Sequence, residues 1–519
     1  MKRALSSGPV LRLLLFALLG VFVLQSCASL PTSETTGSPA PAEASATTRS
    51  VLKTESTATT GSRIVIFHSN DVHGKIDNFA KVAAIIDAER KSGADVFFFS
   101  AGDNFTGDPV IDRYDPPGEP MVELLDRLHL DLLSPGNHEF DYGLEAVRKL
   151  SARFRTISAN IYPQPGVLPE LRPYAVLTAK SGIKLVVFGL IQTEPGSGLP
   201  STHPDKVTGL RFSEPLAKAL ELKKLRADGQ VFIGLTHIGH DQDLLLAKKM
   251  PELDLIIGGH SHTRVETQEI VNGVLIAQAG SDGQFLGRVD LLVKDGRVVE
   301  KKSRLIDLSK VKDEDETIKA MIVKFHQNPA MARIIARAPL EITGKNALGC
   351  LMTDAVRQVH GLDIAFQNNG GIRLSRLPQT ITLHDVYTLD PFGNQIVQID
   401  MTAAEIRSLI KNASEKRYEI DLQVSGISYI VREDAGQQIK EIKLLLPDES
   451  PLPEDRTYKV GISSYIASSY QFAHKDPGRS LQTTTADDLI LYLQSGVNLG
   501  IYRNIQRAFW KKGAAPSRN

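Results

Sequence analysis

Seven side chains of metal-binding type occur in the first half of the chain, each close behind an apolar segment. They are two carboxylates, one amide and four imidazoles: Asp71, His73, Asp103, Asn137, His237, His260 and His262. Divalent transition metals favour donors of these types. Seven ligands are more than one tetrahedral ion can use, whereas a bridging carboxylate would let them serve two ions with positions left for water and substrate. Two such ions about 3.5–4 Å apart suit an in-line displacement at phosphorus.

The elements that must position these residues are five short apolar runs, each typical of a strand covered on both faces. The runs are 64–67, 95–100, 130–133, 230–235 and 253–257. Ligand sites of open α/β sheets lie outside the carboxyl ends of the strands, so five segments of the same polarity should deliver their polar residues to one rim. Helical stretches between them, such as 79–91 and 121–128, are expected to form the crossovers.

Each motif alone has a plainer interpretation. An isolated Asp-x-His pair can simply cap a turn, and an isolated His-x-His pair is a moderate signal. Five loops of this kind, each directly after an apolar strand in one chain, are hard to explain as turn chemistry. The combined pattern therefore favours a metal centre.

These segments resemble, in order, the motifs of the calcineurin-like metallophosphoesterases and, within them, the 5′-nucleotidase family. The matching segments are Asp71-x-His73, Gly102-Asp103, Gly136-Asn137-His138-Glu139, His237 and Gly258-Gly259-His260-Ser261-His262. The resemblance implies an α/β fold, with a four-layer αββα metallophosphoesterase sandwich followed by a second, smaller α/β substrate-binding domain. It also implies a cofactor of two divalent metal ions, such as zinc or manganese.

The resemblance assigns roles to individual residues. One ion would be held by Asp71, His73, Asp103 and His262, and the other by Asp103, Asn137, His237 and His260, with Asp103 as the bridge. His138 resembles the family's catalytic histidine, and Asp141 would orient it and favour its charged form. A protonated His138 could stabilise the developing charge or protonate the leaving oxygen.

Other positions near these motifs receive plainer interpretations. The family prefers other residues at Phe67, Ser69 and Pro135, but none of these departures removes a ligand. His68 and His240 are expected to support the neighbouring ligand loops through hydrogen bonds. The remaining histidines have no partner pattern and are expected on the surface or in the core: His203, His326, His384 and His474.

The second half resembles the C-terminal 5′-nucleotidase domain in four stretches, 348–361, 363–373, 382–400 and 458–470. In that family this domain binds the nucleoside, and its base stacks between two aromatic rings. The resemblance places Phe392 and Tyr465 at the stacking positions, Arg373 on the phosphate or ribose side, and Asn368 in the same loop.

Two departures affect the nucleoside pocket. The family usually has arginine and then asparagine–leucine–glycine–asparagine before a helix, whereas this chain has Gly344-Lys345-Asn346-Ala347-Leu348-Gly349-Cys350. The family also has a glycine–glycine–aspartate–glycine loop after the second aromatic residue. Ser468-Ser469-Tyr470-Gln471 replaces that loop, so the ribose-binding aspartate is missing.

Composition limits the class of protein. The 519 residues include 60 basic and 60 acidic side chains, and 42% are hydrophobic, as in an ordinary globular protein of more than one domain. Balanced charge argues against a binder of nucleic-acid polymers, and two cysteines exclude a disulfide scaffold. The expected domains are 63–310 for the metallophosphoesterase, 311–335 for an interdomain helix and 336–510 for the C-terminal domain.

The N-terminus has the features of an export signal. Residues 1–26 contain an apolar run of 12 residues, which is too short to span a membrane and is typical of a signal peptide. Leu24-Gln25-Ser26-Cys27 resembles the lipobox of bacterial lipoproteins, in which the cysteine carries the lipid. Residues 27–62 then form a disordered tether. The alternative is an ordinary secretory signal cut near Ser26; both interpretations export the protein, and the lipobox predicts anchoring to a bacterial membrane that faces the periplasm or the outside.

The leading hypothesis is an exported phosphohydrolase with two metal ions that acts on nucleotides, most simply a 5′-nucleotidase. Within enzymes the alternatives are a UDP-sugar hydrolase, a 2′,3′-cyclic phosphodiesterase with 3′-nucleotidase activity, and a thiosulfohydrolase-like relative. From another class, the alternative is a surface binding lipoprotein that has lost turnover. The sequence indicates no obligate protein partner.

Overall fold

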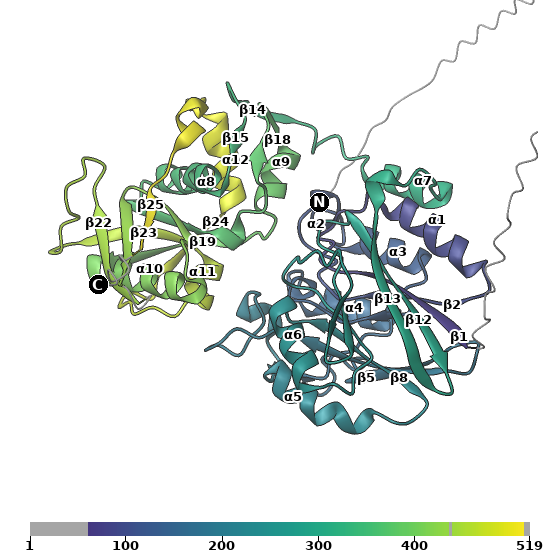
Figure 1. Ribbon diagram of the computed structural model, residues 1–519. Coiled ribbons are helices and arrows are strands. Elements are labelled where there is room, and N and C mark those ends of the chain that lie inside the picture. The colour runs from purple at the N-terminus through teal and green to yellow at the C-terminus, as the bar shows by residue number, and fades with distance from the viewer. Residues whose placement is uncertain (1–60, 435–437, 513–519) are drawn as a thin grey trace, which may run out of the picture. The chain divides into compact units, whose positions relative to one another are not determined.

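A computed structural model describes residues 61–434 and 438–512 of the chain (Figure 1). The predicted signal peptide, Cys27 and nearly all of the predicted tether lie outside these residues. None of the helices in the described ranges is long and apolar enough to cross a membrane.

The N-terminal half contains a five-stranded sheet with the order β13-β12-β1-β2-β3. Its strands β1 (Ser62–Ser69), β2 (Asp95–Ser100) and β3 (Leu132–Leu133) run parallel. A hairpin of β12 (Phe285–Lys294) and β13 (Arg297–Asp307) joins the sheet antiparallel to β1. The carboxyl ends of the three parallel strands therefore open onto one edge of the sheet.

A second sheet of six strands has the order β10-β11-β9-β8-β6-β5. The four central strands are parallel and the two edge strands, β5 and β10, pair antiparallel to their neighbours. Their bounds are β5 Tyr174–Thr178, β6 Lys184–Ile191, β8 Gln230–His237, β9 Leu255–Ile257, β10 Glu269–Val271 and β11 Val274–Ala277.

The two sheets pack face to face because their strands are apolar on both sides. In β1, Ile64 and Ile66 belong to a core shared with the second sheet, whereas Val65 and Phe67 pack against helices. Strand β6 alternates in the same way between the sheet-to-sheet core and a helix-covered core. Such alternation, with both faces buried, gives the near-continuous apolar runs seen in the sequence.

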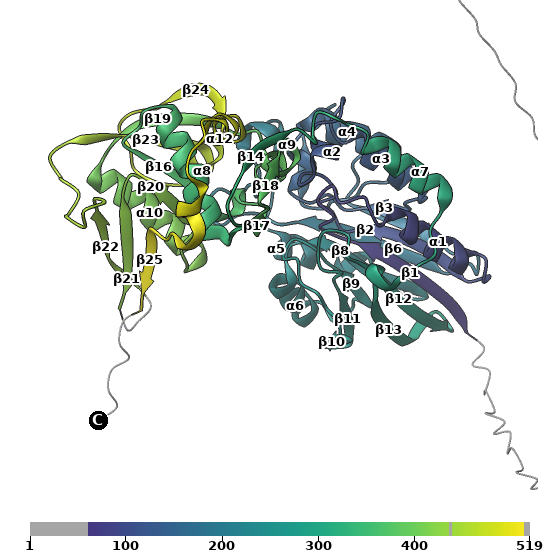
Figure 2. The ribbon, with the colours of Figure 1, turned by 90° about the horizontal axis from the view of Figure 1, so that it is seen from above.

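Helices cover the outer face of each sheet (Figures 1 and 2). The first sheet packs against α1 (Phe79–Arg90), α3 (Glu119–Arg127) and α7 (Glu316–Phe325). The second packs against α5 (Pro215–Glu221) and α6 (His240–Lys249). The predicted four-layer αββα sandwich is confirmed.

The five predicted strands all form, but they are divided between the sheets. Strands β1, β2 and β3 lie in the first sheet, and β8 and β9 lie in the second. Within residues 311–335, predicted as an interdomain helix, the structure has one helix of ten residues, α7. Its apolar residues Ile318, Ile322 and Phe325 are buried in the core of the first sheet, so α7 packs on the sandwich.

The C-terminal half is built on a five-stranded sheet with the order β20-β16-β23-β19-β24. Helix α10 (Ala403–Arg417) packs on one face, where Ile364 and Phe366 of β16 point. Helix α8 (Lys345–Val359) approaches the other face, where Ala365 meets Val356. The strands are β16 Ile364–Asn368, β19 Gln395–Thr402, β20 Leu422–Ser425, β23 Thr457–Ser463 and β24 Arg479–Thr484. The predicted second α/β domain is confirmed.

The C-terminal half also contains smaller elements. A three-stranded sheet consists of β21 (Ser428–Glu433), β22 (Ile439–Leu445) and β25 (Ala508–Lys511). Other elements are β14 Ile334–Arg337, β15 Ile342–Thr343, β17 Arg376–Leu377, β18 Thr380–Thr382, α9 Leu383–Leu389, α11 Ser464–Ser469 and α12 Thr485–Gln494. In the N-terminal half, the remaining short elements are α2 Pro109–Asp112, α4 Leu144–Arg153, β4 Ile161–Pro163 and β7 Leu210–Phe212.

Cys350 lies in α8 and is buried as a free thiol. Burial raises its pKa to about 11, so the thiol stays protonated near neutral pH. This agrees with its interpretation as a small buried apolar residue without a catalytic role.

Candidate active site

The predicted ligands meet where the strand ends of the two sheets come together. Asp71, His73, Asp103 and Asn137 follow strands of the first sheet, and His237, His260 and His262 come from strand ends of the second. Their donor atoms form groups within 4.8 Å of one another. The groups are Asp71 with His73 and His262; His73 with Asp103 and His138; and Asp103 with His237 and His260.

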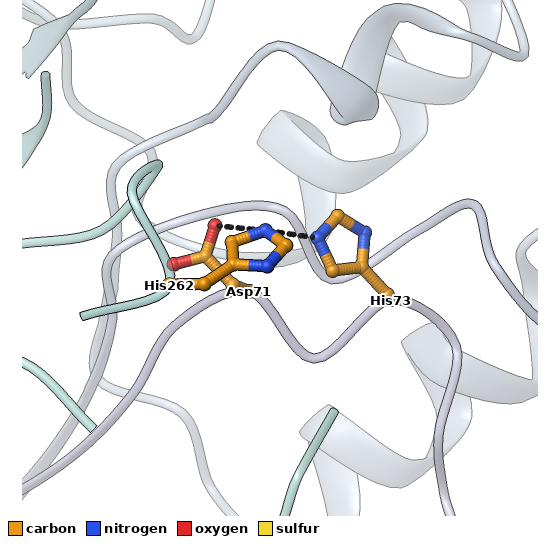
Figure 3. A group of neighbouring side chains, drawn as sticks. All are labelled: Asp71, His73 and His262. Carbon is orange, nitrogen blue, oxygen red and sulfur yellow. Dashed lines mark hydrogen bonds and ion pairs between the residues drawn. The ribbon is translucent and has the colours of Figure 1, made fainter. Parts of the chain in front are cut away.

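The first group joins β1 of one sheet to the loop after β9 of the other (Figure 3). His262 Nε2 lies 3.6 Å from Asp71 Oδ1 and 3.0 Å from His73 Nε2. Figure 3 shows the His262 imidazole between the Asp71 carboxylate and the His73 imidazole. Three donors thus converge on one point.

The second group lies around Asp103. His237 Nε2 is 3.1 Å from Asp103 Oδ2, and His260 Nδ1 is 3.0 Å from Asn137 Oδ1. Asp103 shares one donor group with His73 and another with His237. This position between the two sets is the one that a bridging carboxylate requires.

The orientation of two imidazoles fits metal binding. His73 Nδ1 lies 3.0 Å from the carbonyl oxygen of Thr106, and His237 Nδ1 lies 2.7 Å from that of Ala101. A carbonyl oxygen only accepts, so each Nδ1–H donates and Nε2 turns toward the site. His237 Nε2 is buried and faces the carboxylate of Asp103. Metal-binding histidines are commonly held in this way by a backbone carbonyl.

The charges of the site also fit a cation. Asp71 and Asp103 are 0% and 2% exposed, and their ion-pair partners are histidines. Burial raises the pKa of Asp71, whereas the pKa of Asp103 is held well below its usual range because neighbouring histidines outweigh burial. Burial lowers the pKa of His260 to about 3 and that of His262 to about 4, which keeps both imidazoles neutral as metal ligands require.

The backbone is strained at five of the seven predicted ligands. Their φ angles are positive, at 51° for Asp71, 50° for His73, 54° for Asp103, 81° for His260 and 55° for His262. Residues other than glycine rarely adopt this conformation, which costs of order 1–3 kcal/mol each and is concentrated at functional sites. The surrounding fold therefore holds these side chains in orientations that their own backbone preferences disfavour.

Two glycines allow the ligand loops to approach closely. A Cβ atom on Gly136 would lie 2.2 Å from Asp103 Oδ1 and 2.6 Å from His237 Nε2. Gly102 has a φ of +87°, and its Cβ would lie 2.3 Å from the backbone nitrogen of Gly136. Any larger side chain at either position would push the loops of β2 and β3 apart.

Glu139 is a residue whose role sequence reasoning missed, although it lies inside the most specific motif. Its buried carboxylate accepts hydrogen bonds from the backbone nitrogens of Asp103, Asn104 and Gly136, at 2.7–2.8 Å. One side chain therefore fixes the loops that carry Asp103 and Asn137. The signal in the sequence was its position, because this acidic residue directly follows His138 inside a ligand loop.

His138 and Asp141 are placed as the resemblance implied. His138 Nδ1 lies 2.6 Å from Asp141 Oδ2, which leaves Nε2 facing Asp103 Oδ2 at 4.0 Å. Burial lowers the pKa of His138, but Asp103 and Asp141 outweigh it and the pKa is raised above its usual value. Thr202 Oγ1 donates to the other oxygen of Asp141 at 2.9 Å, a contact that no sequence motif indicated.

The expectations for two other histidines were wrong. His68 is buried, but neither ring nitrogen has a hydrogen-bond partner, and the ring packs on Gly287 of β12. His240 Nε2 pairs with Glu269 at 2.7 Å instead of supporting the loop of His237. His203 lines the cavity described next, because its chain neighbours Ser201 and Thr202 lie at the site.

A cavity of about 560 Å³ opens beside the metal-ligand groups. The four predicted substrate-binding residues all line it: Asn368, Arg373, Phe392 and Tyr465. Arg373 Nη2 lies 3.1 Å from His73 Nδ1, and the Phe392 ring lies 5.8 Å from the His138 ring at an angle of 28°. Among the lining residues that were not predicted are Lys345, Lys416, Asp421 and Tyr470.

Comparison with known families agrees with both halves of this arrangement. The calcineurin-like phosphoesterase family matches residues 64–264, and the 5′-nucleotidase C-terminal domain matches residues 329–472. Together they cover about two thirds of the chain. The chain belongs to the 5′-nucleotidase family.

Individual relatives are similar to this chain over most of its length. The 5′-nucleotidase of Vibrio cholerae is 28% identical over 484 residues, which cover 78% of this chain and 84% of the relative. The trifunctional nucleotide phosphoesterase protein YfkN of Bacillus subtilis is 28% identical over 78% of this chain, which spans only 32% of that longer protein. The crystal structure of the 5′-nucleotidase precursor from Thermus thermophilus has a TM-score of 0.73 and 25% identity, and covers 86% of this chain and 99% of its own.

Family and geometry together define the class of chemistry. The chain is a metal-dependent phosphoric ester hydrolase of the 5′-nucleotidase family, and its cofactor is a pair of divalent ions. The residues that would hold the ions are the seven predicted ligands. When bound, the ions neutralise charge on the phosphate oxygens and lower the pKa of water at the site.

The first prediction concerns metal content. Replacing His237 with alanine should lower the bound metal from two ions per chain and remove phosphatase activity, because His237 joins the second donor group to Asp103. The matched control is His240→Ala, which removes an imidazole three residues away and should keep both ions. Elemental analysis and an aryl phosphate assay measure the two effects, and a His237→Ala enzyme with two ions and full rate would contradict the ligand assignment.

The second prediction concerns the His138–Asp141–Thr202 chain of hydrogen bonds. His138→Ala should keep both ions and lower the rate by roughly 10²–10⁴-fold, as expected when acid–base help is lost. The loss should be smaller for an aryl phosphate with a good leaving group, which needs less help from a proton. A fall in metal content with equal loss for every leaving group would instead make His138 a ligand.

Thr202 provides a graded version of this test. Thr202→Val removes the hydroxyl donor to Asp141 and should cause a smaller loss that also depends on the leaving group. Thr202→Ser keeps the hydroxyl and should restore most of the rate. An equal loss in both variants, or a loss of thermal stability without a change in rate, would show that Thr202 does not act through Asp141.

Proposed function

We propose that this protein is a 5′-nucleotidase that releases inorganic phosphate from nucleoside 5′-monophosphates. The observation that carries the proposal is one cavity whose wall contains Asp103, His138 and His260 together with the aromatic rings of Phe392 and Tyr465. A ligand that fills it can present phosphate to the metal-ligand groups while its apolar part lies against aromatic rings. Nucleotides combine these two parts in one molecule.

Arg373, a cationic residue beside the metal-ligand groups, is the residue that we expect to bind the phosphate. Arg373 is adjacent to His73 and its guanidinium carbon lies 5.8 Å from the centre of the Phe392 ring. A guanidinium can donate two parallel hydrogen bonds to phosphate oxygens, which fixes the orientation of the phosphate as well as its charge. Asn368, which lines the cavity in the same loop, can add a further polar contact.

The leaving oxygen requires a proton or an equivalent positive charge. His138 suits this task because its Nδ1 is held by Asp141 and its raised pKa favours the protonated form near neutral pH. The Nε2–H is then the group that can donate to the leaving oxygen. We therefore assign His138 to proton donation and not to metal binding, although it lies in one donor group with His73 and Asp103.

The nucleoside is held by stacking. Aromatic rings contribute roughly 1–3 kcal/mol per stacked base and tolerate different bases. Phe392 and Tyr465 both line the cavity, so we expect hydrolysis of several nucleoside monophosphates with little preference among bases.

A substrate panel tests this function. The purified protein with added manganese or zinc should hydrolyse nucleoside 5′-monophosphates faster than 3′-monophosphates, 2′,3′-cyclic phosphates or UDP-glucose, and a chelator should abolish the activity. Phosphate release measures each rate. Preference for UDP-glucose or for a cyclic phosphate would replace the proposal with the corresponding alternative, and binding of nucleotides without turnover would indicate a binding protein.

We also propose that the protein is exported and anchored by a lipid on Cys27. The support is the sequence of the N-terminus, where a short apolar run ends in Leu24-Gln25-Ser26-Cys27. The following segment, rich in serine, threonine, alanine and proline, would let the enzyme work at a distance from the membrane.

The third prediction tests this anchor, with the substrate panel as its activity assay. Cys27→Ser should release the protein from the membrane fraction while leaving its phosphatase rate unchanged, because a tether separates the lipid from the catalytic domain. Cell fractionation with immunodetection measures the change, and Ser26→Ala is the matched control that should stay on the membrane. Wild-type protein in the soluble periplasmic or secreted fraction would favour the ordinary secretory signal.

A further inference from the structure

Asp421 is a carboxylate on the cavity wall for which neither the metal centre nor phosphate binding gives a role. It lies just before β20, is 2% exposed and lines the cavity. Its Oδ2 accepts a hydrogen bond from the hydroxyl of Tyr470, which also lines the cavity. A buried carboxylate is costly unless it is hydrogen-bonded, and a carboxylate at a binding cavity selects ligands that can donate to it.

Tyr470, which pairs with Asp421, lies at a position where this chain departs from the family. Tyr470 is the third residue of the Ser468-Ser469-Tyr470-Gln471 loop, where the family has its aspartate. The Tyr470 ring packs at 77° to the ring of Tyr465, with centres 6.2 Å apart, and Lys416 Nζ lies 5.2 Å from the centre of the Tyr470 ring. The loop therefore lacks its own carboxylate, and its tyrosine instead holds a carboxylate from another part of the domain.

Hydrogen bonds made by Asn369 fix the segment of Asp421 beside the loop that carries Arg373. The backbone nitrogen of Asn369 donates to the carbonyl oxygen of Asp421 at 2.7 Å, and Asn369 Nδ2 donates to that of Ile420 at 2.6 Å. Gln423 Nε2 donates to Asn369 Oδ1 at 3.0 Å. Three hydrogen bonds thus tie the 420–423 segment to the loop of residues 368–373.

These contacts link Asp421 to two parts of the cavity wall. Arg373, beside His73, marks the phosphate end. Tyr465, which packs on Tyr470, marks an aromatic part of the wall. Asp421 is tied to the Arg373 loop through Asn369 and to the aromatic part through Tyr470. In a nucleotide the sugar lies between the phosphate and the base, so the sugar hydroxyls are the donors that this position would meet.

We propose that Asp421, positioned by Tyr470, binds the 2′- and 3′-hydroxyls of ribose and makes the enzyme selective for ribonucleotides over deoxyribonucleotides. The proposal rests on the proposed nucleotidase function and names its substrate class. A carboxylate can accept from both hydroxyls of a cis-diol, and a 2′-deoxy sugar leaves part of that acceptor capacity unused. Sites built to bind a hydroxyl reject analogues that lack it more strongly than apolar pockets reject extra groups.

The fourth prediction compares ribo and deoxy substrates. Wild-type enzyme should hydrolyse AMP with a kcat/KM roughly 10- to 100-fold above that for 2′-deoxy-AMP, the range expected for hydrogen bonds to a charged group. Asp421→Asn should reduce this ratio to about 3 or less while leaving the rate with an aryl phosphate unchanged. The matched control is Asp448→Asn, an exposed acid of the same domain, which should keep the wild-type ratio.

A second variant guards against a folding defect. Tyr470→Phe retains the carboxylate but removes the hydroxyl that holds it, and should lower the ratio part of the way. Thermal unfolding of each variant shows whether it is folded. A wild-type ratio near 1, or a ratio unchanged in both folded variants, would overturn the proposal. A change in the ratio of GMP to IMP with an unchanged sugar ratio would also overturn it, because Asp421 would then contact a base.

An inhibition assay separates this proposal from the nucleotidase function. Adenosine, 2′-deoxyadenosine and 3′-deoxyadenosine can be compared as inhibitors of aryl phosphate hydrolysis, which needs no turnover of a nucleotide. Adenosine should inhibit at least 10-fold more strongly than either deoxynucleoside in the wild type, but not in Asp421→Asn. Hydrolysis of AMP without this difference would leave the nucleotidase function standing and overturn the role of Asp421. The difference without hydrolysis of AMP would support the sugar site and overturn the nucleotidase function.

Discussion

Two carboxylates buried side by side are the constraint on which this structure depends. Asp71 and Asp103 have almost no exposed surface, and lone buried charges of one sign are strongly unfavourable. Their ion-pair partners are imidazoles instead of lysine or arginine, and the two carboxylates raise the pKa of His237 to about 10, so this point of the fold demands a positive charge that a bound metal ion would supply. The demand for positive charge at this point explains why so many histidines converge there.

The rest of the sandwich holds these two carboxylates and their neighbouring ligands in place. The ligand backbones adopt conformations that cost energy, Gly136 removes a side chain that would collide with Asp103 and His237, and Glu139 ties two loops together. None of these features adds stability by burying apolar surface. They are supported by the cores between and outside the two sheets, where the favourable free energy of burial is concentrated. The substrate side is assembled separately on the C-terminal sheet.

Much of this arrangement could be predicted from the sequence because its signals are local. A short apolar run followed at once by Asp, Asn or His specifies both the strand and the residue at its end, so the strands and the convergence of the ligands followed from adjacent residues. The division of those strands between two sheets did not follow, because both sheets produce the same apolar runs. The helix predicted at 311–335 is confined to the ten residues of α7, and its packing on the sandwich depends on three apolar side chains within a polar stretch.

Contacts between distant residues were the main omissions. Thr202 reaches Asp141 across 61 positions and Tyr470 reaches Asp421 across 49, and neither side chain belongs to a recognisable pattern. His68 and His240 were assigned supporting roles from proximity in sequence, but the direction of each side chain is set by the strand or helix that carries it. After Tyr465 the sequence shows that the aspartate of the family is missing. Only the fold reveals that Asp421, on a neighbouring segment, provides a carboxylate there.

The distribution of ligands between the two sheets has a mechanical consequence. Each donor group that contains His237, His260 or His262 also contains an aspartate from the other sheet, so a bound ion adds a cross-link between two layers that also meet through apolar contacts and hydrogen bonds. The free energy of ion binding then stabilises the packing of the two sheets, and this stabilisation increases with the free concentration of the metal. We therefore expect the two sheets to separate less readily at this edge, and the domain to resist proteolysis there more strongly, when the concentration of divalent cations around the protein is higher.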